Sequence, residues 1–197
     1  MDKISNQGQQ TDIALVQGST FDKTFVWRAA PTIRKSITAI TKANPGVVTC
    51  VSHGFTTGQK RFISGVRGMT EVNDAAYTVT VITPNSFSIG TNTTSYSDYV
   101  SGGRADNGLP VDLTNWTARM QIRASLESAA AAVDMTTANG RIVLGGTAGT
   151  VRLLLSDTVT AGISLTNGVY DLELIAPDAT VRQLLYGKVT IAKEVTR

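Results

Sequence analysis

Residues 109–123 read Leu109-Pro-Val-Asp-Leu-Thr-Asn-Trp-Thr-Ala-Arg-Met-Gln-Ile-Arg123, and the second half of this stretch alternates between apolar and polar side chains. One face carries Trp116, Ala118, Met120 and Ile122. A period of two is typical of a β-strand that is buried on one side and solvated on the other. Trp116 and Met120 supply enough apolar surface to anchor a core. The stretch therefore predicts a central strand of an all-β domain.

The segments on either side continue this pattern. Val169–Ile175 alternates apolar and acidic residues, and Val181–Val195 is a long final strand in which Gly187 indicates a bulge or bend. Further strands are expected at Asp12–Val16, Thr20–Arg28 and Arg141–Leu144. Ser125–Ala132 fits a short helix or a loop equally well, and Ser156-Asp-Thr is typical of a helix cap. Short strands with turn signals between them predict a β-sandwich.

Residues 36–103 differ in composition and carry a hydrophobic pattern of their own. They are rich in Thr, Ser, Asn and Gly, and they include a predicted hairpin around Pro84-Asn85. Strands are expected at Ser36–Thr41, Val47–Val51, Arg61–Ser64, Ala76–Ile82 and Ser86–Ile89. We interpret this segment as a small domain inserted into the sandwich.

Composition excludes several classes of protein. Of the 197 residues, 42% are hydrophobic and 17% charged, and no apolar run approaches the roughly 20 residues of a membrane span. The net charge is +3, and the tightest basic group is Lys60 and Arg61, followed by Arg67. A nucleic-acid interface usually concentrates basic charge on one face. We therefore expect neither a membrane nor a nucleic acid as a partner.

The sequence offers few residues for catalysis. Its single cysteine and histidine, Cys50 and His53, lie three apart and would point to opposite faces of a strand. One Cys and one His cannot form a Cys/His zinc site. The loop Gly145–Gly149 lacks the Lys-Ser/Thr ending of a phosphate loop, and Asp171 with Glu173 fits a solvated strand face. We expect no enzyme, no cofactor and no metal, and we assign no catalytic, cofactor-binding or metal-binding residue.

The first ten residues, 1–10, are polar and without a period. We expect them to form a flexible arm that orders only against a neighbouring protein.

The insert resembles a known module. From Ile40 it reads Ile-Thr-Lys-Ala-Asn-Pro-Gly-Val-Val-Thr, followed by His-Gly-Phe-Thr-Thr-Gly-Gln and Ile-Ser-Gly-Val-Arg-Gly-Met-Thr-Glu-Val-Asn. The order of these motifs is similar to the small β-barrel named after the first catalytic cysteine half-domain (FCCH) of ubiquitin-activating enzymes. Copies of that module occur in tail and other virion proteins of bacteriophages. The resemblance implies no catalytic role for Cys50.

The flanking segments resemble a second family. Gln17-Gly-Ser-Thr-Phe, Val111–Arg123, Tyr170-Asp-Leu-Glu-Leu and Gly187-Lys-Val-Thr-Ile are similar to phage tail or baseplate proteins with an immunoglobulin-like sandwich. The amino-terminal domain of siphophage upper-baseplate proteins is of this type. The resemblance implies a structural component of a virion tail, made in the bacterial host cytoplasm. Its partners would be other tail, baseplate or fibre proteins, in multiple symmetric copies.

Together these interpretations predict an all-β chain, an immunoglobulin-like β-sandwich interrupted by a small inserted β-barrel. The predicted parts are a flexible arm at 1–10, a discontinuous sandwich at 11–35 and 104–197, and the insert at 36–103. An alternative is a carbohydrate-binding module for the host surface, for which Tyr96 and Tyr99 are the candidate contact residues.

Overall fold

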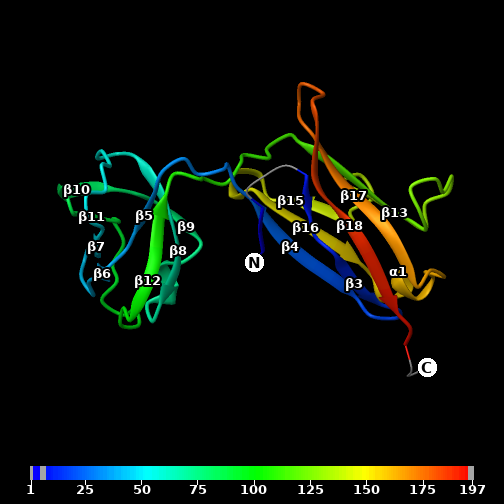
Figure 1. Ribbon diagram of the computed structural model, residues 1–197, viewed down its shortest axis with the longest axis horizontal. Coiled ribbons are helices and arrows are strands. Elements are labelled where there is room, and N and C mark those ends of the chain that lie inside the picture. The colour runs from blue at the N-terminus through cyan, green and yellow to red at the C-terminus, as the bar shows by residue number, and fades with distance from the viewer. Residues whose placement is uncertain (1, 5–7, 195–197) are drawn as a thin grey trace. The chain divides into compact units, whose positions relative to one another are not determined.

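The computed structural model describes residues 2–4 and 8–194 of the protein. The chain is all-β, as the sequence predicted, and it divides into two compact units (Figure 1). Unit 1 comprises Met1–Arg28 and Pro110–Arg197, and unit 2 comprises Ala29–Leu109. The unit boundaries thus lie six or seven residues outside the insert bounds expected from composition. Over the described part of the chain, no helix combines the length and apolar character needed to cross a membrane.

Unit 1 contains two β-sheets. Sheet A consists, in spatial order, of β1 (Asp2–Ile4), β4 (Phe21–Trp27), β16 (Thr150–Leu155) and β15 (Ile142–Leu144). Sheet B consists of β14 (Val133–Thr136), β13 (Thr117–Arg123), β17 (Asn167–Ile175), β18 (Val181–Ala192) and β2 (Gln9–Gln10), with β3 (Ile13–Val16) also paired to β18. β1 runs parallel to β4, and β2 and β3 run parallel to β18, whereas the other pairs are antiparallel.

The two sheets share one hydrophobic core. Alternate residues of β13 are buried, and they are those that the sequence placed inward: Ala118, Met120 and Ile122. The same core receives side chains from sheet A, among them Phe25, Val151 and Leu153. Burial of apolar side chains between facing sheets is the main favourable term of such a two-layer fold.

Trp116 lies at the edge of this core. It precedes β13, is half-buried, and packs edge-to-face on Trp27 with ring centroids 5.7 Å apart and an interplanar angle of 81°. The fully buried anchors of β13 are therefore Met120 and Ile122, and Trp116 closes the end of the core beside them.

Several local predictions fit the observed elements and others do not. Ser156 caps the short helix α1 (Asp157–Ala161), and its side chain accepts a hydrogen bond from the Val159 amide. Residues 125–132 form turns and no helix, because Ser125 and Ser128 hydrogen-bond each other locally instead. The final strand ends at Ala192, three residues before the expected end, and the last residue of the expected strand, 195, lies outside the described residues.

The amino-terminal segment differs from the expected arm. Residues 2–4 form β1 beside β4, residues 9–10 form β2 beside β18, and Ile4 is buried in the core of unit 1. In this structure residues 2–4 and 9–10 are therefore paired with strands of unit 1, and residues 1 and 5–7 lie outside the described residues. The mobility expected of this segment in solution stays a prediction. The segment that we expected to order against a neighbouring protein thus lies along strands of its own unit.

Unit 2 contains two four-stranded sheets around a separate core. One sheet has the order β10 (Thr80–Thr83), β11 (Ser86–Ser88), β7 (Val47–Thr49), β6 (Ala39–Ile40). The other has the order β5 (Arg34–Ser36), β12 (Ser101–Asp106), β8 (Lys60–Arg67), β9 (Ala75–Thr78), and a short 3-10 turn, η1 (Thr70–Val72), joins β8 to β9. Its described residues form no closed barrel, which corrects the barrel prediction: each sheet ends in strands with a single neighbour.

Two predicted strands of unit 2 are each divided between the two sheets. The expected strand at 36–41 splits into β5 and β6, because the Ile37 amide bonds to Gly103 and the next amide, of Thr38, bonds to Thr49. The expected strand at 76–82 splits at Val79, a fully buried residue whose amide bonds to Gln59. Strands that pass from one sheet to another at a bend form corners between packed sheets.

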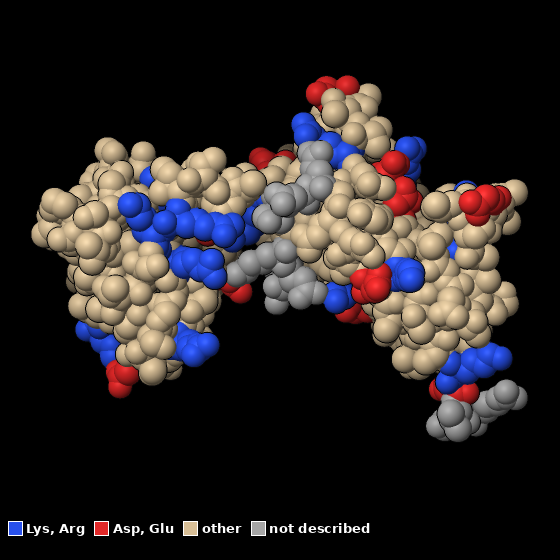
Figure 2. All heavy atoms as spheres, in the orientation of Figure 1, with Lys and Arg blue, Asp and Glu red and all other residues tan. Residues whose placement is uncertain are grey.

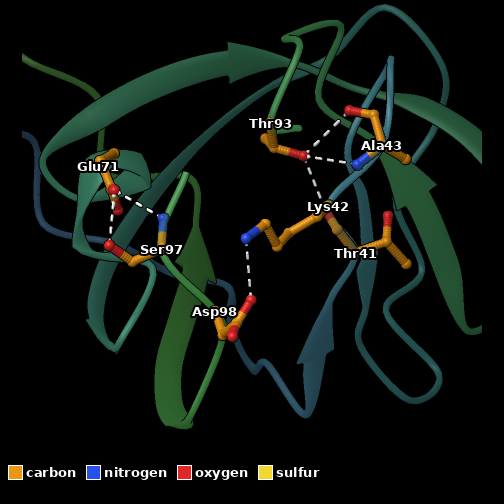
Figure 3. A network of polar contacts seen from close by, with 7 residues as sticks. All are labelled: Thr41, Lys42, Ala43, Glu71, Thr93, Ser97 and Asp98. Carbon is orange, nitrogen blue, oxygen red and sulfur yellow. Dashed lines mark hydrogen bonds and ion pairs between the residues drawn. The ribbon is translucent and has the colours of Figure 1, made fainter. Parts of the chain in front are cut away.

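A polar network holds the long connection between β11 and β12 (Figure 3). The buried hydroxyl of Thr93 lies 2.7 Å from the carbonyl of Thr41 and 3.1 Å from that of Ala43, and it accepts a hydrogen bond from the Ala43 amide at 3.1 Å. Further along, Glu71 accepts from the amide and hydroxyl of Ser97, and its own backbone amide together with that of Ser97 lowers the pKa of its carboxyl. The Thr93 hydroxyl thus serves as hydrogen-bond partner to backbone groups of both Thr41 and Ala43.

We expect Thr93→Val to lower the free energy of unfolding of unit 2 by about 1–3 kcal/mol, because it leaves the partly buried Ala43 amide and Thr41 carbonyl without their partner. Urea unfolding monitored by circular dichroism measures this loss. Thr94→Val is the control, since Thr94 is exposed and its hydroxyl bonds to the neighbouring Asn92 side chain. Equal stabilities of the two variants would contradict the role given to Thr93.

Each unit should fold without the other. Arg28 and Pro110 form an antiparallel bridge where the chain leaves and re-enters unit 1, so a two-residue turn can join them. Replacing residues 29–109 by Asn-Gly should leave a monomer that melts cooperatively, as seen by gel filtration and circular dichroism. An expanded species without a cooperative transition would show that unit 1 depends on unit 2.

Candidate binding groove on sheet B

The outer face of sheet B carries an ordered set of polar side chains. Because Ala118, Met120 and Ile122 point into the core, the intervening residues of β13 point outward. The same alternation holds on β17, where Leu172 and Leu174 are buried. The sequence predicted this outward face on each strand, but not which strands are neighbours.

The strand register places these side chains in rows across the sheet. Gln121 lies opposite Asp134 on one side and Asp171 on the other, Asp171 lies opposite Tyr186, and Tyr186 lies opposite Gln10. The rows on either side of this central row consist of Arg119, Glu173 and Gln183 and of Arg123, Val169 and Lys188. Residues from five strands thus meet on one surface.

Several members of these rows are fixed by one another. Arg119 and Glu173 form an ion pair with 2.7 Å between Nε and Oε2. The Gln121 amide donates to Asp134 at 3.0 Å and its carbonyl accepts from Arg123 Nη2 at 2.7 Å. These contacts hold the side chains of β13 in defined positions.

A loop forms one wall of the surface. Residues 124–132 connect β13 to β14, and Arg123 Nη1 donates to the carbonyls of Ser128 and, at 2.9 Å, Ala129. Leu126 on this loop is 84% exposed. The loop and the sheet face enclose a groove of about 660 Å³, within the range of about 300–1,000 Å³ usual for small-molecule sites.

The floor of the groove offers groups with unused hydrogen-bonding capacity. Within the described residues, the Asp171 carboxylate, the Lys188 ammonium and the Tyr186 hydroxyl have no hydrogen bond or ion pair with the rest of the chain. The Tyr186 side chain is 40% exposed. The groove therefore presents an acceptor, a donor and an aromatic ring beside the fixed side chains of β13.

A close backbone contact joins β18 to the segment before β3. The Tyr170 hydroxyl donates to the Thr11 carbonyl at 2.6 Å, and a Cβ at Gly187 would lie 2.4 Å from the same oxygen. Burial raises the pKa of Tyr170, so its hydroxyl remains a donor. Gly187 is needed for this approach and not for a bulge, because the register shift of β18 lies near Leu184 instead.

The other residues singled out in the sequence lie away from the groove. Cys50 is fully buried, and this burial raises the pKa of its thiol to about 11. His53 is also buried: its Nδ1 accepts from the Phe55 amide at 2.9 Å, and its Nε2 lies 3.0 Å from the Thr83 carbonyl. Both ring nitrogens are thus engaged by backbone, and the thiol is held in its unreactive form.

The glycine-rich loop has a structural role. It joins β15 to β16 through a 3-10 turn, η2 (Gly146–Ala148). A Cβ at Gly149 would lie 2.8 Å from the Trp27 carbonyl, and the Leu113 amide donates to the Gly146 carbonyl. The glycines permit these approaches, in keeping with the interpretation of the loop as a connection between strands.

The candidate sugar-binding tyrosines are also structural. Tyr96 and Tyr99 pack against the core of unit 2, and the Tyr99 hydroxyl lies 3.1 Å from the Ile37 carbonyl and 3.0 Å from that of Gly102. They form no exposed platform. The exposed ring beside free polar groups is that of Tyr186, which no local sequence pattern singled out.

The basic residues of unit 2 are arranged differently from the expectation. Lys60 and Arg67 lie at opposite ends of β8, and Arg61 is buried with its guanidinium 4.3 Å from the centroid of the Phe55 ring. The same sheet contains Arg34 and Arg104. In Figure 2, basic side chains gather in a row on the visible face of unit 2. Basic residues that are scattered in the sequence are therefore partly brought together by the fold.

Comparison with known proteins identifies part of the chain. Residues 43–107 match the family of the ubiquitin-activating enzyme E1 FCCH domain. Over 72 residues the chain is 46% identical to human ubiquitin-like modifier-activating enzyme 6, and over 71 residues it is 44% identical to the rabbit (Oryctolagus cuniculus) ubiquitin-like modifier-activating enzyme 1. These alignments cover 35% and 34% of this chain and 7% of either relative.

We expect Gly187→Ala to lower the free energy of unfolding of unit 1 by about 1–3 kcal/mol, because the added methyl group forces Thr11 away from β18. The matched control is Gly162→Ala, where the nearest atom to a new Cβ is 3.6 Å away. Chemical denaturation of both variants measures the difference. Indistinguishable midpoints would rule out the close contact between Gly187 and Thr11.

The alignments span only a small part of the relatives, and the family match at residues 43–107 falls within unit 2 and contains β7 to β12. The inserted unit of this chain therefore contains an FCCH domain of the type found in ubiquitin-activating enzymes.

Proposed function

We propose that the protein is a non-enzymatic structural component of a phage virion, an adaptor that docks other tail, baseplate or fibre proteins. The observation that carries the proposal is the position of the motifs that resemble phage tail proteins. Val111–Arg123, Tyr170–Leu174 and Gly187–Ile191 contribute to β13, β17 and β18, which are consecutive neighbours in sheet B. In this proposal the two sheets of unit 1 form an immunoglobulin-like sandwich.

The FCCH domain supports a modular protein of this kind. Its match covers 7% of the ubiquitin-like modifier-activating enzymes, so the likeness concerns one domain and not their activity. Unit 2 also has its own core and enters unit 1 at a single bridge position. An insertion of this form adds a surface to a sandwich without disturbing its strands.

Docking by the sandwich requires a sheet edge that is open to a partner. Side chains already bond to the backbone groups along the edge of β14. Asn139 Oδ1 accepts from the Thr136 backbone amide at 2.9 Å, and Arg141 Nη1 donates to the Asp134 backbone carbonyl at 2.7 Å. β3, in contrast, pairs with β18 and, within the described ranges, with no strand on its other side. Val16 on β3 is 46% exposed.

We therefore propose that other virion proteins, present in multiple symmetric copies, pair with the β3 edge. Addition of a strand to an open edge is a common mode of association. In this account the chain is made in the bacterial cytoplasm and acts in the assembled tail, and neither a membrane nor a nucleic acid is its partner.

Purified particles test the proposal. We expect mass spectrometry to find the chain in gradient-purified particles, and Val16→Lys to reduce its copies per particle, because a lysine on an edge strand opposes pairing. Val143→Lys is the control, since Val143 is 47% exposed on β15 of the other sheet.

Absence of the wild-type chain from the particles would contradict the virion assignment. Loss of the Val143→Lys variant with normal incorporation of Val16→Lys would move the docking edge to sheet A. Circular dichroism of both purified variants shows that each is folded.

A further inference from the structure

We propose that the groove on sheet B binds a short neutral oligosaccharide, with Tyr186 as its stacking residue. This inference stands on the groove itself and does not depend on the virion assignment. The proposed sugar site lies on sheet B, and not at Tyr96 and Tyr99 of unit 2, which were the candidates from sequence.

The aromatic ring provides the first requirement of a sugar site. One face of a sugar ring presents C–H groups, which pack well against the electron-rich face of an aromatic side chain. Tyr186 lies on the floor of the groove and is 40% exposed. Its neighbours across the sheet are Asp171 and Gln10, so polar groups flank the ring on both sides.

These neighbours provide the second requirement, which is hydrogen bonding to hydroxyl groups. A sugar hydroxyl both donates and accepts. The Asp171 carboxylate accepts, the Lys188 ammonium donates, and the side-chain amide of Gln10 does both. All of them line the groove, and Asp171 and Lys188 have no competing side-chain partner among residues 2–4 and 8–194.

The site is also held in shape before a ligand arrives. The Arg119–Glu173 pair and the bonds from Gln121 to Asp134 and Arg123 fix the side chains of β13. Arg123 in turn holds the loop that carries Leu126. Because few groups need to be ordered on binding, weak individual contacts suffice for measurable affinity.

The charge of the groove favours a neutral ligand. Asp171 lies in the central row and Glu173 in the next, and both line the groove together with Arg119, Arg123 and Lys188. Both arginines are engaged within the chain, and the two charged groups without a partner among the described residues, the Asp171 carboxylate and the Lys188 ammonium, have opposite signs and cancel each other. A protein partner would require a larger apolar centre than Leu126 and Tyr186 provide.

The test uses the whole 197-residue chain and defined sugars. Maltotriose, cellotriose, mannotriose and chitotriose serve as neutral probes and 3′-sialyllactose as an anionic one, with binding followed by saturation-transfer difference NMR and calorimetry. We expect at least one neutral trisaccharide to bind and the anionic probe not to bind. Tyr186→Ala should weaken the affinity for that trisaccharide about tenfold or more, and Asp171→Asn should weaken it by a smaller factor.

Val143→Ala, at an exposed position of sheet A, is the matched control and should bind as the wild type does. Thermal melts establish that all variants are folded. The proposal is overturned if no neutral trisaccharide binds to the folded protein. It is also overturned if binding survives Tyr186→Ala unchanged, or if the anionic probe binds more tightly than the neutral ones.

Discussion

The antiparallel pairing of β13, β17 and β18 is the constraint on which unit 1 depends. β17 is paired along its whole length with β18 and over seven residues with β13. Because side chains alternate, this single register decides which residues enter the core and which face outward. A slip by one residue would expose Leu172 and bury Asp171, and a carboxylate buried without a partner is strongly unfavourable. The inner face thereby enforces the arrangement of the outer one.

The groove is a consequence of the same register. Its rows of polar side chains follow from the cross-strand pairs. Core packing and the outer surface are thus two results of one pattern of strand pairing. Unit 2 does not share this constraint, since its sheets surround a core of their own.

Sequence reasoning succeeded where a pattern is local. The period of two predicted the buried face of β13, Ser156 predicted the cap of α1, and the motif order after Ile40 predicted the FCCH domain. It failed where the outcome depends on residues distant in the chain. Nothing near Gln10 shows that it lies beside Tyr186, and nothing near Val79 shows that its strand divides between two sheets.

The candidate site was only partly predictable for the same reason. Asp171 and Glu173 were placed correctly on an outward face, but the groove also needs Tyr186 from β18, Gln10 from β2 and the loop with Leu126. Strand pairing brings Tyr186 and Gln10 together, and the contact of Arg123 with the loop brings Leu126 beside them. No local sequence pattern indicates either of these long-range contacts. Tyr96 and Tyr99, by contrast, were selected as exposed and are held against a core.

Native-state hydrogen exchange tests the central claim most directly. If β17 is the strand on which unit 1 depends, amides of Val169–Ile175 should exchange only through global unfolding of unit 1, with the highest protection in that unit, and amides of unit 2 should report a separate unfolding free energy. Exchange of the β17 amides by local fluctuation, with greater protection in edge strands such as β14 or β15, would contradict the account.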